Sequence, residues 1–116
     1  RYLATGVRAA VKAWGLRECA QRPEIASDSL TAVLVPADKD ARTVIDLAFR
    51  RYDIALGSGL SEVAGKVFRI GHLGDMNALT LAGALAGTEM ALADAGFDIT
   101  LGSGVGAALA QWRVPA

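Results

Sequence analysis

The chain has 116 residues and a mass of 12.0 kDa; hydrophobic residues make up 53% of it and charged residues 21%. This length predicts a single domain, and the hydrophobic content excludes a disordered segment, which combines low hydrophobicity with high net charge. Twelve basic residues balance twelve acidic ones, so charge gives no reason to expect binding to nucleic acid or to an anionic membrane surface. The only cysteine, Cys19, excludes an internal disulfide and a cysteine-based zinc site, and is compatible with a reducing cytoplasm.

The first third of the chain predicts a helix, a loop and a strand. Apolar residues recur at spacings of three and four along residues 1–15, which indicates one apolar helix face, and Gly15 can end that helix in a left-handed cap. The polar segment 20–29 predicts a loop. The β-branched run 31–35 ends at Pro36 and predicts a short strand.

The middle of the chain predicts a helix followed by two strands. Asp38 or Asp40 can cap a helix over residues 41–52. Short strands are predicted at 54–56 and at 66–70, and because about ten residues join them, we expect them to pair antiparallel.

The last third predicts two helices. Asp75 or Asn77 can cap a long helix over residues 77–95. The glycine-rich segment 97–104 is expected to be extended and to lead into a short helix over 105–112.

This order of elements predicts an α+β fold in which a small antiparallel or mixed sheet is covered by helices on one face. The helices at 41–52 and 77–95 are expected on the same face. Glu89 and Asp94 interrupt the long apolar stretch of the second helix, and a membrane span needs about 20 apolar residues. The stretch therefore predicts a buried helix and no membrane span.

Two glycine-rich segments are candidates for anion binding. In the segment 102–106 (GSGVG), backbone N–H groups at a helix start could bind a phosphate. The segment lacks the Lys-Ser/Thr pair of a nucleotide-binding loop and the strand–helix–strand context of a dinucleotide fingerprint. We favour a tight-turning connection, both here and at 57–59.

The remaining reactive side chains give no assignable site. His72 is the only histidine, and a metal site would have to combine it with distant carboxylates; it could also act as a base in a cleft or serve a structural role. Cys19 has no paired base and is expected to be a buried structural thiol. The serines predicted on loops, Ser58, Ser61 and Ser103, cannot be paired with that histidine from sequence.

Arg69 is the candidate binding residue. Side chains alternate along the strand 66–70, so Phe68 and Ile70 point to one face while Val67 and Arg69 point to the other. A planar guanidinium on a rigid strand suits a bidentate carboxylate. Spacing alone leaves an ordinary surface or salt-bridged arginine as the alternative.

Residues 64–77, AGKVFRIGHLGDMN, resemble the C-terminal domain of class V aminotransferases, in particular the serine–glyoxylate and alanine–glyoxylate branch. The resemblance covers essentially the whole chain. Further segments agree in order and spacing: 6–11 (GVRAAV), 52–60 (YDIALGSGL), 83–87 (GALAG) and 102–108 (GSGVGAA).

The resemblance implies an enzyme that depends on pyridoxal phosphate and has the aspartate aminotransferase fold (fold type I). In that family a large domain binds the cofactor and a smaller C-terminal α+β domain closes over the substrate, and residues 1–116 resemble the small domain alone. The resemblance implies transfer of an amino group from serine or alanine to glyoxylate or another 2-oxo acid, with Arg69 binding the substrate α-carboxylate. It also implies a homodimer, built mostly through the large domain.

The resemblance places the Schiff-base lysine, the aspartate that pairs with the pyridine nitrogen and most of the phosphate-binding residues outside this sequence. None of the three lysines, Lys12, Lys39 and Lys66, has the family's Schiff-base context. We therefore predict no catalytic, cofactor-binding or metal-binding residue here, and expect the isolated chain to be inactive. The alternative is a free-standing α+β module that binds a small ligand or pairs with itself. The start at Arg1, within a helical pattern, favours a piece of a longer protein.

Overall fold

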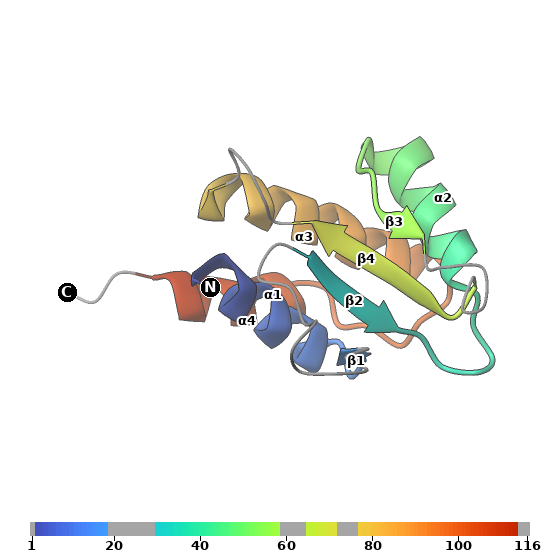
Figure 1. Cartoon of the computed structure of the whole chain (residues 1–116), viewed down its shortest axis with the longest axis horizontal. Coiled ribbons are helices and arrows are strands. Elements are labelled where there is room, and N and C mark those ends of the chain that lie inside the picture. The colour runs from blue at the N-terminus through green and yellow to red at the C-terminus, as the bar shows by residue number, and fades with distance from the viewer. Residues whose placement is uncertain (1, 19–29, 59–64, 72–76, 114–116) are drawn as a thin grey trace.

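The computed structural model describes residues 2–18, 30–58, 65–71 and 77–113. In this part of the chain an antiparallel sheet is combined with helices, so the predicted α+β class is confirmed (Figure 1). The elements in chain order are α1 (Tyr2–Ala13), β1 (Arg17–Glu18), β2 (Leu30–Leu34), α2 (Ala41–Tyr52), β3 (Gly57–Ser58), β4 (Val67–Gly71), α3 (Ala78–Asp94) and α4 (Ser103–Trp112).

The sheet has the strand order β1-β2-β4-β3, with every neighbouring pair antiparallel. The two longer strands, β2 and β4, form its centre, and Phe68 lies opposite Val33 in their register. The central pair is therefore the one that is not consecutive in sequence, because α2 and β3 intervene between β2 and β4. The two strands that follow α2 pair antiparallel as expected, although the first of them, β3, lies at 57–58 and not at 54–56.

The prediction of a strand at 54–56 is wrong, because the backbone at the start of this segment closes the C-terminal end of α2. Asp53 adopts a left-handed conformation with φ of 57°, and the Ile54 amide donates to the Ala48 carbonyl at 3.0 Å. That helix-terminating pattern uses the backbone donor that a strand would need. Pairing with β4 begins only at Gly57. The two-residue strand β1 was not predicted, since two residues carry no alternation pattern.

One face of the sheet and the helices share a single hydrophobic core. Phe68 and Ile70 of β4 are almost completely buried, as the strand alternation predicts. Buried residues of both α2 and α3 join the same cluster, so these two helices pack on one core as expected, and Figure 1 shows the sheet lying in front of α3. The fully buried members from the two helices include Val44, Ala48, Leu81, Leu85 and Leu92.

Capping residues fix the helix ends close to the predicted positions. The Asp40 carboxylate accepts a hydrogen bond from the Arg42 amide at 2.9 Å, and the Asn77 side chain accepts from the Thr80 amide at 2.8 Å. Gly15 has a φ of 76°, which confirms the left-handed turn after α1. None of the described helices combines the length and hydrophobicity needed to cross a bilayer.

Candidate functional site

Arg69 lies in the middle of β4, with small residues on both sides. Its register partners are Ala32 on β2 and Gly57 on β3. A Cβ atom placed on Gly57 would come within 3.3 Å of the Arg69 Cβ and 3.7 Å of its Cδ. The missing side chain at position 57 therefore gives the alkyl stem of the arginine room to lie beside the β3 backbone.

The Arg69 side chain belongs to the sheet face opposite the core. Phe68 and Ile70 alternate with it and point into the core, as predicted. On the Arg69 side, Leu34 is 37% exposed whereas Val67 is only 3% exposed. This face is therefore partly apolar and partly covered, and Arg69 itself is half-buried.

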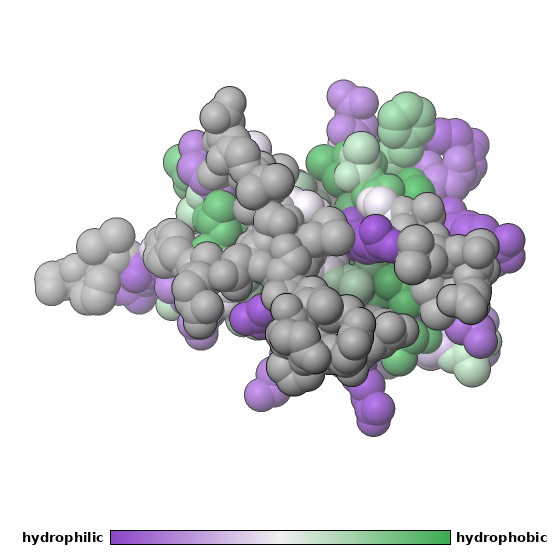
Figure 2. All heavy atoms as spheres, viewed as in Figure 1, coloured by the Kyte–Doolittle hydropathy of each residue, from purple (hydrophilic) through white to green (hydrophobic). Residues whose placement is uncertain are grey.

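Arg69 has no carboxylate partner within the described residues, unlike the arginines on α2. Arg42, Arg50 and Arg51, all on α2, contact Asp40, Asp46 and Asp94. Hydrophilic side chains gather over this helix in Figure 2.

Side-chain exposure also distinguishes Arg69 from the other described arginines that have no acidic partner. Arg8 approaches Glu18 at 3.4 Å, and the other arginines without an acidic partner in the described ranges, Arg17 and Arg113, are exposed. Arg69 thus combines partial burial with a guanidinium that has no acidic partner among the described residues.

The glycine-rich segment at the start of α4 binds an internal carboxylate. Glu89 of α3 is 4% exposed and accepts hydrogen bonds from the backbone amides of Gly102, Gly104 and Val105. The Trp14 indole donates to the same carboxylate at 2.9 Å. The amides considered for phosphate binding are therefore engaged by the protein's own anion, placed at a helix N-terminus where negative charge is favoured.

These hydrogen bonds determine the charge state of Glu89. Burial alone would raise the pKa of its carboxyl group, but the bonds from Trp14 and from the Gly102, Gly104 and Val105 amides outweigh that effect and lower the pKa below its ordinary value. In the sequence, Glu89 stands out only as an interruption of an apolar stretch. A lone acidic residue within an apolar helix was the signal that could have identified it.

Close packing accounts for Gly104 in this segment. A Cβ atom on Gly104 would lie 2.1 Å from the Trp14 Nε1 and 2.9 Å from a Glu89 oxygen. The neighbouring Ser103 hydroxyl is buried and has no hydrogen-bond partner in the described part of the chain. The favoured interpretation, a tight connection, is correct for the backbone here but missed its carboxylate partner.

Several candidates from the sequence lie outside the described residues, namely Cys19, Ser61 and His72. Ser58 lies in β3. Of the lysines, Lys12 and Lys66 are exposed, whereas Lys39 lies 5.8 Å from the centre of the Phe97 ring. Among the described residues, no group of three His, Cys, Asp or Glu side chains could hold a metal ion.

The sequence is similar to curated aminotransferases along nearly its full length, although no protein-family model matches it. It is 56% identical to the serine–glyoxylate aminotransferase of Methylorubrum extorquens over 111 residues, which are 96% of this chain and 28% of that enzyme. It is 54% identical to the L-aspartate–glyoxylate aminotransferase of Paracoccus denitrificans over 112 residues, again 96% of this chain and 28% of that enzyme. The chain thus spans little more than a quarter of the length of these relatives.

Solved structures give the same result. The ureidoglycine–glyoxylate aminotransferase of Bacillus subtilis superposes with a TM-score of 0.89 and 28% identity, covering 98% of this chain and 30% of that one. The pyridoxamine–pyruvate aminotransferase of Mesorhizobium loti superposes with a TM-score of 0.85 and 36% identity, covering 95% of this chain and 28% of that one. The chain is therefore homologous to one portion of the class V aminotransferases of fold type I, in the branch that includes the serine–glyoxylate and aspartate–glyoxylate enzymes.

Proposed function

We propose that this chain is the C-terminal small domain of an aminotransferase that moves an amino group from serine or another amino acid to glyoxylate or a related 2-oxo acid. In this proposal Arg69 binds the α-carboxylate of the substrate. The observation that carries it is the half-buried guanidinium of Arg69, which lies on a central strand of the sheet and has no acidic partner in the part of the chain that the structure describes. The donor class follows the names of the relatives at 54–56% identity, which use serine or aspartate.

Partial burial of an arginine that has no acidic partner costs free energy unless a bound anion pairs with the guanidinium. Desolvation weakens the hydration of the guanidinium, and no described carboxylate compensates for that loss. A substrate carboxylate would form two parallel charge-assisted hydrogen bonds with the planar fork. Ala32 and Gly57 on the flanking strands present no bulky side chain to obstruct that approach.

The residues described here do not fit a pyridoxal phosphate site. The helix N-terminus that could hold a phosphate is already engaged by Glu89, and no lysine lies on the sheet strands. We propose that the remaining part of the longer protein supplies the cofactor site with its lysine, and that this chain alone neither holds the cofactor nor transaminates. The cofactor, once bound there, supplies the electron sink for the amino-transfer chemistry.

The contribution of this chain is orientation. Holding the carboxylate at Arg69 restricts rotation of the substrate and fixes the direction of its Cα–H bond, which lowers the entropic part of the barrier. Because β4 is hydrogen-bonded on both edges, the guanidinium has a rigid base from which to act. We further propose that the full protein is a homodimer assembled mostly through its large domain.

The test is substitution of Arg69 in the full-length enzyme. Arg69→Ala removes two charged hydrogen bonds of about 1.5–3 kcal/mol each, so kcat/KM for amino acids should fall by two to four orders of magnitude. Arg69→Lys should recover little of it, because an ammonium group cannot replace the planar fork. The loss should be much smaller for an amine that lacks the carboxylate.

Arg17→Ala is the matched control, since Arg17 is also without an acidic partner in the described residues but is exposed. It should leave kcat/KM unchanged. An equal loss of kcat/KM for the carboxylate-free amine, or full activity of a folded Arg69→Ala variant, would contradict the proposed role.

A further inference from the structure

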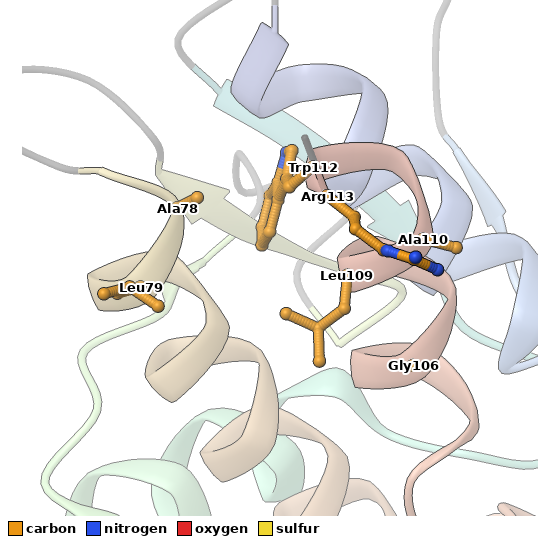
Figure 3. A pocket seen from close by; sticks show the side chains of 7 residues that line it. All are labelled: Ala78, Leu79, Gly106, Leu109, Ala110, Trp112 and Arg113. Atoms are coloured by element: carbon orange, nitrogen blue, oxygen red, sulfur yellow. The ribbon is translucent and has the colours of Figure 1, made fainter. Parts of the chain in front are cut away.

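An apolar groove lies between the start of α3 and the end of α4, away from Arg69. Its volume is about 500 Å³, and Figure 3 shows its walls: Ala78 and Leu79 on α3 face Leu109 and Trp112 on α4, with Arg113 at the rim. We call this surface, formed by these five residues together with Gly106 and Ala110, the α3–α4 groove.

Two leucine side chains that line the α3–α4 groove are exposed. Leu79 is 82% exposed and Leu109 is 45% exposed, and both border the same hollow. Contiguous apolar surface next to a cavity is typical of a contact with another protein surface. Leu101, which is 64% exposed, does not line this groove.

The beginning of α1 adjoins this groove. A Cβ atom on Gly6 would lie 2.1 Å from the Trp112 indole, so the first turns of α1 pack directly against the ring that forms the groove wall. Figure 1 shows the same arrangement, with the N-terminal end beside the end of α4. Polypeptide joined to α1 would therefore emerge next to the α3–α4 groove.

We infer that the α3–α4 groove is the docking surface for the rest of a longer aminotransferase polypeptide. This inference rests on the proposed function, in which the chain is one domain of such a protein. The related enzymes carry about 70% of their length outside the region matched here, which supplies an occupant within the same molecule. The fitting partner surface is an apolar segment that places a carboxylate near Arg113, since Arg113 is exposed and has no acidic partner in the described ranges.

Radical footprinting of leucine side chains in the full-length protein tests this contact. In the chain described here Leu79 is more exposed than Leu101, so without a covering partner it should be labelled at least as fast. Docking of the rest of the polypeptide should reverse that order and make Leu79 and Leu109 react several-fold more slowly than Leu101. Labelling of Leu79 at the rate of Leu101 would overturn the inference.

A pair of variants separates the groove from general surface effects. Leu79→Asp places a charge in the contact and should raise the labelling rate of Leu109 several-fold, whereas Leu101→Asp should leave it unchanged. Protection of Leu79 that disappears on dilution to monomers would identify a second copy as the occupant and would also overturn the inference. The kinetics of Arg69→Ala are measured separately, so labelled Leu79 in an enzyme that depends on Arg69 refutes the docking alone.

Discussion

Two charged residues of this molecule, Glu89 and Arg69, differ in their burial and in their hydrogen-bond partners. Glu89 is almost completely buried and receives hydrogen bonds from three backbone amides and one indole. Arg69 is half-buried and receives no partner from the described residues. A buried charge that is fully satisfied stabilises one arrangement of helices, whereas an unsatisfied charge on a rigid strand is available for a ligand. The contrast separates Glu89, whose charge is satisfied within the fold, from Arg69, whose charge we propose binds the substrate.

Glu89→Gln should produce the largest loss of stability. The amide retains only one acceptor oxygen, and its NH2 group would face a backbone N–H donor that the carboxylate now satisfies. We expect the free energy of unfolding to fall by about 2–4 kcal/mol, since hydrogen bonds to charged groups contribute about 1.5–3 kcal/mol each. Denaturant unfolding of the full-length protein measures it. Glu18→Gln, which affects only the exposed contact with Arg8, is the control and should change stability by less than about 1 kcal/mol.

The same comparison predicts that the stability contributed by Glu89 depends on pH. The pKa of Glu89 is lower in the folded protein than its ordinary value, so the unfolded chain takes up a proton first as pH falls. The stability that Glu89 contributes is therefore complete above the ordinary glutamate pKa and is lost as pH falls through the folded pKa. The stability difference between wild type and Glu89→Gln should shrink over that acidic range. A difference that stays constant down to the lowest pH would contradict the assigned charge state.

Gly104→Ala should have a smaller but clear effect on the same junction. The added methyl group would overlap the Trp14 indole and approach Glu89, and overpacking of this kind costs about 1–3 kcal/mol. Gly106→Ala is the matched control, because a Cβ atom there meets nothing within 4 Å. In a helix that change should be neutral or stabilise by about 0.5–1 kcal/mol. Equal melting temperatures for the two variants would argue against tight packing at Gly104.

Arg69→Ala should have the smallest effect on stability, although it is expected to have a large effect on activity. No described side chain depends on its guanidinium, so the free energy of unfolding should change by no more than about 0.5 kcal/mol. Thermal unfolding without substrate measures this directly. A loss of unfolding free energy as large as that of Glu89→Gln would show that Arg69 has a structural role like that of Glu89.

Local sequence signals determined most of the secondary structure. The helix at 41–52 was predicted at its observed bounds, and the strand pattern at 66–70 lies within one residue of β4. Both succeed because capping residues and periodic burial act over a few neighbouring positions. The same alternation placed Arg69 opposite Phe68 and Ile70, and the resemblance carried by residues 64–77 indicated the family.

Only the tertiary structure decided which partner each group meets. Residues 54–56 have the composition of a strand, but the Ile54 amide closes α2, so pairing with β4 begins later. The glycines at 102–106 have the composition of an anion-binding loop, but Glu89, thirteen residues before Gly102, fills that role from α3. Periodicity predicts whether a side chain is buried. Which residue it contacts depends on how segments far apart in the chain pack together. For that reason the sequence determined the faces of the sheet and helices. The packing of α1, α3 and α4 decided that Glu89 is satisfied, and the tertiary structure leaves Arg69 without an acidic partner among the described residues.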